Sequence, residues 1–352
     1  MARSRIATAL EGGLSLTPGD ILVLRPPAEM DLFALGPERL LIHHTFRPDR
    51  DAWAGAGLRV VEEPEAASVA LVCVPRSKAL ARSLIAEAAA RAPLVLVDGQ
   101  RSDGVDALWR EVRARREDRV EGLAQGHGRL FWFEGGAGFE DWALPGPVQH
   151  EGGLFTQPGV FSADGPDRGT LLLVEALPAR LPARMADFGA GIGVLSLAVL
   201  GREGVQAVDL VEAERLALDC ARLNVQDPRA RFLWEDATAG ARGPYDGIVM
   251  NPPFHAGRKA DPRLGRAFLE AAAKALTPQG ALWVVANRHL PYEAPLEALF
   301  RQVEEIGGDA GFKLLHAAQP LKGKGAAPRD VARAPKGKGA GARDVARARR
   351  GR

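Results

Sequence analysis

Short apolar runs alternate with amphipathic stretches along most of the chain. In the first third, six apolar runs end at glycine, proline or charged residues, as buried strands do: 21–25, 39–44, 58–63, 68–75, 93–99 and 128–135. Apolar residues recur at three- and four-residue steps over 78–90 and 105–116, which indicates helices. This pattern predicts a parallel α/β domain.

The same alternation is clearer in the second half. The pattern predicts strands at 185–188, 205–212, 230–234, 247–250 and 282–286, separated by helices at 194–200, 213–224 and 263–276. This order is typical of a doubly wound sheet. Near the end, 301–306 and 311–317 flank a glycine-rich turn, which predicts an antiparallel hairpin that closes the sheet.

The segment between these two stretches differs in composition and shows no regular pattern. Residues 135–153 are rich in glycine and proline and carry no strand or helix periodicity. A chain of 352 residues also exceeds what one hydrophobic core usually holds. We therefore expect an N-terminal domain at 1–140 and a second domain at 151–320.

Charge divides the chain unevenly. The overall net charge is +2, but residues 321–352 carry +9, which leaves −7 for the rest. Within this segment 322–335 recurs as 336–349, an imperfect tandem repeat without an apolar face. Such a unit buries too little to offset the entropy of ordering, so we expect 321–352 to be a disordered basic tail.

Composition excludes several protein classes. No apolar run approaches the ~20 residues of a membrane span, and the first residues do not resemble a secretory signal. Cys73 and Cys220 lie in apolar segments, which excludes a disulfide framework or a cysteine-rich metal site. His43 and His44 have no acidic or cysteine partner at ligand spacing, so we expect no metal. A cytoplasmic protein without membrane association fits these features.

A glycine-rich turn follows the predicted strand at 185–188. It reads Asp-Phe-Gly-Ala-Gly-Ile-Gly, with Asp187, Gly189, Gly191 and Gly193. Glycines there let the backbone turn sharply and let a ligand approach the main chain. A dinucleotide fingerprint requires its third glycine at 194, which is valine, whereas this spacing is the form that holds S-adenosylmethionine.

Three acids are candidates for the rest of a cofactor site. A carboxylate that ends the next strand can accept from both ribose hydroxyls, and Glu212 and Asp209 compete for this role. We prefer Glu212 because it falls at the strand end. Asp236 follows the next strand and is a candidate to accept from the adenine amine, although a helix N-cap explains it almost as well.

The most specific motif is Asn-Pro-Pro-Phe at 251–254, directly after a buried strand. Two prolines fix the backbone and remove two donors, which leaves carbonyl acceptors free. If the Asn251 side-chain oxygen and the Pro252 carbonyl each accept from a planar exocyclic amine, its lone pair is drawn out of conjugation towards a methyl group. Phe254 would then stack on the flipped base.

These motifs together resemble a known family. DFGAGIG, VDLVEAERLALDCARLN and YDGIVMNPPFH are similar to the motifs of class I S-adenosylmethionine-dependent methyltransferases with an Asn-Pro-Pro-Phe signature. More narrowly, the chain from 153 to about 318 resembles the ribosomal RNA guanine-N2 methyltransferases of type C, which modify the small ribosomal subunit, and the related type G, which modify the large one. The displaced acid within DLVE and the repeat tail depart from the family pattern.

The resemblance implies two tandem Rossmann-like methyltransferase domains, the first degenerate and the second catalytic. It implies S-adenosylmethionine as cofactor, guanine N2 in small-subunit (16S) ribosomal RNA as substrate, ribosomal RNA or a ribosomal subunit as partner, and a monomer. Alternatives that the motif leaves open are a large-subunit (23S) guanine, adenine N6 and a protein glutamine amide, because the same acceptors serve any planar amine. A noncatalytic RNA-binding assembly factor is the alternative from another class.

Overall fold

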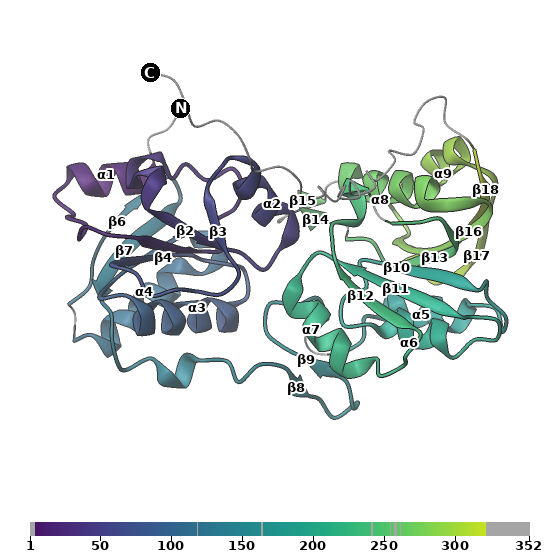
Figure 1. Cartoon of the computed structure of the whole chain (residues 1–352), viewed down its shortest axis with the longest axis horizontal. Coiled ribbons are helices and arrows are strands. Elements are labelled where there is room, and N and C mark those ends of the chain that lie inside the picture. Colours follow the sequence, from purple (N-terminus) through teal and green to yellow (C-terminus); the bar gives the residue numbers. More distant parts are fainter. Residues whose placement is uncertain are drawn as a thin grey trace, which may run out of the picture. The chain divides into compact units, whose positions relative to one another are not determined.

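The computed structural model describes residues 4–321 except 118, 163–164, 241, 254, 257–258 and 261. Residues up to Leu321 form one compact unit that contains two seven-stranded sheets (Figure 1). The predicted basic tail, apart from Leu321, lies outside the described residues. Two sheets with helices on both faces confirm the predicted α/β class with two tandem domains.

The first sheet has the order β3-β2-β1-β4-β5-β7-β6. Its strands are β1 (Ile21–Leu24), β2 (Leu40–His43), β3 (Arg59–Val61), β4 (Val69–Cys73), β5 (Leu94–Gln100), β6 (Glu121–Gln125) and β7 (Gly128–Glu134). Strands β1 to β5 are parallel as predicted, but β7 is antiparallel to β5 and β6. The turn between β6 and β7, Gly126-His127, has positive φ at both residues, and a tight turn of this kind requires an antiparallel hairpin.

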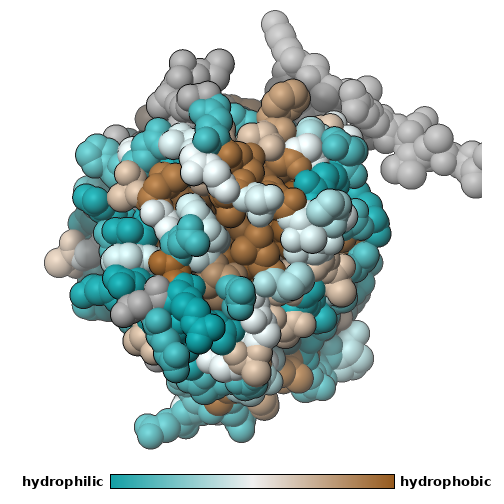
Figure 2. Space-filling model, turned by 90° about the vertical axis from the view of Figure 1, so that its left-hand side faces the viewer, coloured by the Kyte–Doolittle hydropathy of each residue, from teal (hydrophilic) through white to brown (hydrophobic). Residues whose placement is uncertain are grey.

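Helices cover both faces of this sheet. α3 (Lys78–Arg91) and α4 (Val105–Arg115) pack on one face, while α1 (Arg5–Glu11) and α2 (Arg47–Gly55) pack on the other (Figure 1). Figure 2 shows the side of the molecule at which α1, β6 and β7 lie, where hydrophobic residues gather at the centre within a hydrophilic surround. The partly buried hydrophobic residues of these three elements are Leu10, Leu123 and Trp132.

The second sheet repeats the topology of the first, with the order β12-β11-β10-β13-β16-β18-β17. Its strands are β10 (Arg184–Phe188), β11 (Ala207–Glu212), β12 (Ala230–Trp234), β13 (Tyr245–Met250), β16 (Leu276–Asn287), β17 (Phe300–Gly308) and β18 (Phe312–Pro320). β17 and β18 form the antiparallel hairpin that the glycine-rich turn predicted. The two domains are therefore built on one plan.

Five helices flank the second sheet. α5 (Arg168–Ala176), α6 (Val194–Leu200) and α7 (Arg215–Asn224) pack on one face, and α8 (Pro262–Ala275) and α9 (Glu293–Leu299) on the other (Figure 1). The sequence pattern did not indicate α5, whose N-cap is Asp167. α7 begins two residues later than predicted, because the Ala213 carbonyl accepts from Arg47 of the first domain and Glu214 is the N-cap.

Shorter elements complete the described chain. Two-residue strand pairs are β8 (Val148–Gln149) with β9 (Phe155–Thr156), and β14 (His255–Ala256) with β15 (Lys259–Ala260). Single 3₁₀ turns occur at Phe33–Leu35, Pro37–Arg39, Arg101–Asp103, Glu140–Trp142 and Ala237–Ala239. Among the helices of the described residues, none is long and apolar enough to cross a membrane.

Candidate active site

The glycine turn joins β10 to α6 at the carboxyl edge of the second sheet. Gly189 has φ 73° and its backbone N–H donates to the Val211 carbonyl of β11 at 2.8 Å. Gly191 has φ 55°, and a Cβ added there would meet only open space, so the turn leaves a cradle beside the main chain. Gly193 is required for close packing, because a Cβ there would lie 2.8 Å from the Val225 side chain.

Asn224 at the end of α7 holds this turn from the side. Its amide nitrogen donates to the carbonyl oxygens of Ile192 and Phe155, both at 2.9 Å, and its oxygen accepts from the Phe155 N–H at 2.6 Å. Asn224 therefore joins the glycine turn to β9, which precedes the sheet. This contact fixes the turn without occupying the space beside Gly191.

Asp187 is fully buried at the end of β10. One oxygen accepts from the Ser196 hydroxyl at 2.7 Å, while Oδ1 has no hydrogen-bond partner among the described residues. Burial raises the pKa of this carboxyl to about 7, and the nearby Glu212 carboxylate adds to the increase. A buried acceptor without a partner is costly in an isolated protein, so Asp187 is a candidate for a binding site.

Glu212 ends β11 beside the glycine turn. Its two oxygens accept from the backbone N–H groups of Gly191 at 2.8 Å and Glu214 at 2.7 Å. Burial raises the pKa of this carboxyl above its usual range, although the two backbone donors oppose the effect. The remaining lone pairs of a carboxylate held in this way can accept from the hydroxyls of a ligand.

Asp209 lies on the same strand but in a different network. Its carboxylate accepts from Arg231 at 2.6 and 2.8 Å and from the Tyr245 hydroxyl at 2.9 Å. Tyr245 begins β13, so this cluster lies towards the amino ends of the strands, away from the glycine turn. The structure thus brings Glu212, and not Asp209, next to the turn.

Asp236 follows β12, the next strand outward. Its Oδ1 accepts from the backbone N–H of Thr238 at 2.8 Å and from the Thr238 hydroxyl at 2.7 Å, so it caps a 3₁₀ turn. The preceding residue, Glu235, donates its backbone N–H to the Glu212 carbonyl at 3.1 Å. Asp236 is therefore near the end of β11, at the same edge as Glu212.

Asn251 follows β13, the neighbour of β10 on its other side. Its amide nitrogen donates to Asp167 Oδ2 at 3.0 Å and to the Thr170 hydroxyl at 2.8 Å. Both N–H groups are thereby used by α5, which leaves the side-chain oxygen as an acceptor. Pro252 is buried, and Phe254 lies outside the described residues.

Sequence reasoning did not identify Asp167 and Thr170 as part of the site. Asp167 caps α5 through the Thr170 N–H at 3.1 Å, and the same carboxylate orients Asn251. The available sequence signal was an acid three residues before a threonine at the start of a helix. An ordinary N-cap gives the same signal, so the pair did not stand out. Their function becomes visible only because α5 packs beside β13.

The described residues contain no group of three or more histidine, cysteine, aspartate or glutamate side chains that could hold a metal ion. Cys73 and Cys220 are both buried free thiols. The arrangement thus consists of a glycine cradle, a carboxylate at the end of β11 and an amide acceptor at the end of β13. All three lie at the carboxyl edge of the sheet, where open α/β sheets bind ligands.

Comparisons with known proteins show which proteins this chain is similar to. The family model described as "Methyltransferase small domain" matches residues 151–316, the part of the chain that forms the second sheet. This part of the chain is similar to that family.

Two relatives confirm the narrower resemblance. The chain is 38% identical over 168 residues to ribosomal RNA small subunit methyltransferase C of Hahella chejuensis, covering 47% of this chain and 49% of that protein. It is 29% identical over 263 residues to the protein of the same name from Shewanella halifaxensis, covering 71% of this chain and 77% of that protein. The chain thus matches about half the length of the Hahella protein.

A solved structure shares this fold over most of the chain. It is the T. Thermophilus 16S rRNA N2 G1207 methyltransferase, RsmC, in complex with AdoMet and guanosine. The alignment covers 90% of this chain and 92% of that one, with a TM-score of 0.74 and 23% sequence identity. The tandem arrangement of two sheets is therefore a shared fold and not a peculiarity of this chain.

Proposed function

We propose that this protein transfers a methyl group from S-adenosylmethionine to the exocyclic N2 amine of a guanine in small-subunit (16S) ribosomal RNA. The observation that carries the proposal is the oriented amide of Asn251, whose oxygen is left to accept from a planar amine. The names of the relatives support guanine N2 and the small subunit. We further propose a cytoplasmic monomer that acts on ribosomal RNA or a ribosomal subunit and needs no metal.

The residues of the second domain fit S-adenosylmethionine. Gly189 and Gly191 would let its amino-acid portion approach the main chain, and the unpartnered Oδ1 of Asp187 would gain a donor there. Glu212 would accept from the ribose hydroxyls and Asp236 from the adenine amine. When bound, the cofactor supplies a methyl group on a positively charged sulfur.

The chain's own contribution to the reaction is positioning. The Asn251 oxygen and the Pro252 carbonyl would each accept one N–H of the guanine amine, so that its lone pair leaves conjugation with the ring. Asp167 and Thr170 keep the Asn251 oxygen in this orientation. Phe254 would stack on the flipped base. After methyl transfer the amine can release its proton to solvent, so the proposal assigns no general base.

We assign residues 151–320 to the catalytic domain and 1–140 to a degenerate domain. At the position of the glycine turn, β1 is followed by Arg25, Pro26 and Pro27. An arginine and two prolines offer no cradle for a cofactor. Residues 321–352, with their high positive charge, are proposed to contact RNA phosphates.

Mass analysis of ribosomal RNA tests the proposal. RNA digests from cells with and without the gene are compared, and the purified protein is offered isolated small and large ribosomal subunits. Loss of one N2-methylguanine from 16S RNA, restored by the purified protein on small subunits, is expected. A missing methyl group on 23S RNA, on adenine N6 or on a protein glutamine would contradict the assigned substrate.

A further inference from the structure

The first domain contacts the second at the turn that follows Glu212. Thr45 and Phe46 follow β2 of the first sheet, and Phe46 forms a β-bridge with Glu214. The bridge is flanked by two reciprocal backbone bonds, Arg47 N–H to the Ala213 carbonyl at 2.8 Å and Arg215 N–H to the Thr45 carbonyl at 2.9 Å. We call residues 213–215 the ribose-side turn.

The two turns that meet here occupy equivalent positions. Both sheets have the same strand order, so β1 corresponds to β10 and β2 to β11. The Arg25 N–H bonds to the His43 carbonyl at 2.9 Å, as the Gly189 N–H bonds to Val211, and both residues have positive φ. By this register Arg25 stands where the second domain has Gly189.

The same register matches His44 with Glu212. His44 Nδ1 accepts from the Phe46 N–H at 2.9 Å, just as Glu212 accepts from the Glu214 N–H. Burial lowers the pKa of His44 to about 3, with a further decrease from the Arg25 charge, so the ring is a neutral acceptor. The first domain thus has an equivalent turn, with Arg25 and His44 at the positions of Gly189 and Glu212.

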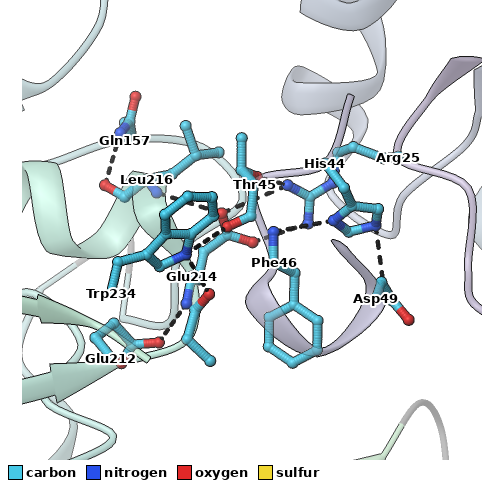
Figure 3. Close-up of polar contacts among 11 residues, drawn as sticks. Arg25, His44, Thr45, Phe46, Asp49, Gln157, Glu212, Glu214, Leu216 and Trp234 are labelled. Carbon is cyan, nitrogen blue, oxygen red and sulfur yellow. Dashed lines mark hydrogen bonds and ion pairs between the residues drawn. The ribbon is translucent and has the colours of Figure 1, made fainter. Parts of the chain in front are cut away.

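Arg25 makes its strongest contact with the other domain. Its guanidinium donates to Glu214 Oε2 at 2.8 Å and also to the Thr45 hydroxyl (Figure 3). The side chains of Arg25 and Glu214 are each only 13% exposed, so the pair is largely removed from solvent screening. Trp234 closes the other side of the turn by donating to the carbonyl oxygens of Ala213 and Thr45 at 2.9 and 3.1 Å.

Glu214 links Arg25 directly to Glu212, the proposed ribose-binding acid. The carboxylate of Glu214 is held by Arg25, while its backbone N–H donates to Glu212 Oε1 at 2.7 Å (Figure 3). The other Glu212 oxygen bonds to Gly191. One of the two donors that orient Glu212 is therefore fixed in place by a residue of the domain without a cofactor site.

We propose that Arg25 is a positioning residue for the cofactor site of the second domain, acting through Glu214 on the orientation of Glu212. The proposal rests on the function proposed above, in which Glu212 holds the ribose. Without the Arg25 contact the ribose-side turn loses a charge-assisted bond, and the Glu212 carboxylate loses its fixed orientation. Affinity for S-adenosylmethionine falls, while Asn251 and its partners are unchanged.

The test compares two equally buried arginine–carboxylate pairs. Arg5 and Asp98 form a pair within the first domain, 2.6 Å apart, with side chains 13% and 11% exposed. Arg5→Ala therefore removes a matched ion pair without touching the ribose-side turn. Titration calorimetry with S-adenosylmethionine, thermal unfolding and steady-state kinetics are measured on full-length Arg25→Ala, Arg25→Lys and Arg5→Ala.

Arg25→Ala is expected to bind S-adenosylmethionine roughly tenfold more weakly, whereas Arg5→Ala stays within about twofold of wild type. KM for the cofactor rises while kcat at saturation stays within a few-fold. Arg25→Lys, which keeps the charge but not the planar fork, is expected to fall between wild type and Arg25→Ala. If Arg25→Ala does not fold, Glu214→Gln weakens the same contact and is expected to lower affinity several-fold.

Two outcomes separate failure of this inference from failure of the proposed function. If Glu212→Ala binds weakly but Arg25→Ala and Glu214→Gln bind as Arg5→Ala does, the inference alone is overturned. If wild type does not bind S-adenosylmethionine, or Glu212→Ala binds it normally, the proposed cofactor site and the inference are overturned together.

Discussion

At the level of single residues, the candidate site depends on side chains whose hydrogen-bonding capacity is only partly used. Asn251 donates both N–H groups to α5 and keeps its oxygen available. Asp187 keeps one buried oxygen without a partner in the described part of the chain. These two groups mark where a substrate amine and a cofactor would complete the hydrogen bonding.

Asn251→Ala is predicted to lower kcat by roughly 10²–10³-fold while affinity for S-adenosylmethionine barely changes, because its oxygen matters only as the amine lone pair emerges. Thr170→Val removes one of the two groups that orient the amide and is predicted to lower kcat about tenfold. Single-turnover kinetics on both variants, with calorimetry for the cofactor, measure the effects. Turnover of Asn251→Ala within a few-fold of wild type would rule out this mechanism.

The raised pKa of Asp187 leads us to predict that the stability of the protein depends on pH. Its pKa is about 7 in the folded protein and about 4 when unfolded, so between these values the folded state binds more protons. The free energy of unfolding therefore loses a contribution as the pH rises from about 4 to 7, of up to about 4 kcal/mol. This contribution is fully present below pH 4 and stays lost above pH 7.

Asp187→Asn resembles the protonated acid and lacks this dependence. The stability of the variant relative to wild type is predicted to increase from pH 4 to pH 7 and then to level off. Denaturant unfolding of both proteins at several pH values measures the difference and cancels the opposite contribution of His44. A difference that is constant over this range would contradict the elevated pKa.

At the level of helices and strands, β11 separates two acids by position. Glu212 ends the strand beside the glycine turn, and Asp209 lies among Arg231 and Tyr245. Residues on one strand can therefore belong to two networks at opposite ends of a sheet. Strand position, more than residue type, decides which acid lies beside the glycine turn.

Glu212→Ala is predicted to weaken S-adenosylmethionine binding more than Asp209→Ala does. Asp209→Ala instead leaves Arg231 and Tyr245 without their acceptor and is predicted to lower stability by about 1–3 kcal/mol. Calorimetry gives the order of the affinities, and thermal unfolding gives the order of the stabilities. The reverse order of affinities would transfer the ribose contact to Asp209.

At the level of the whole molecule, the two domains share one topology but differ in the residues at equivalent turns. Both sheets have the same strand order, but Arg25 stands in the first domain where Gly189 stands in the second. The cation that fills this position reaches Glu214 of the other domain. The position that carries the glycine cradle in the second domain thus carries a contact between domains in the first.

One S-adenosylmethionine per chain is therefore predicted. The arginine and prolines after β1 do not repeat the glycine turn that follows β10, so only the second domain is expected to bind the cofactor. Titration calorimetry at protein concentrations well above Kd measures the stoichiometry, with Gly191→Val as a control that is expected to abolish binding. Two cofactors per chain, or one that persists in the control, would contradict a degenerate first domain.

Local sequence was sufficient for the features that depend on neighbouring residues. Periodic apolar positions predicted most strands and helices of the second domain, though not α5 or α9, because burial repeats along a helix or strand. The glycines after β10 and the prolines after β13 indicated a cradle and an acceptor because they restrict the backbone locally. The α/β class and the ribosomal RNA methyltransferase resemblance followed from these local signals.

Which distant residues meet was determined by packing in three dimensions. Asn251 is oriented by Asp167 and Thr170, 84 and 81 positions earlier, and Arg25 contacts Glu214 across 189 positions. Local patterns carry no information about such pairs, because each side chain alone reads as an ordinary cap or surface charge. Packing of α5 against the sheet and of one domain against the other turns these residues into parts of one site.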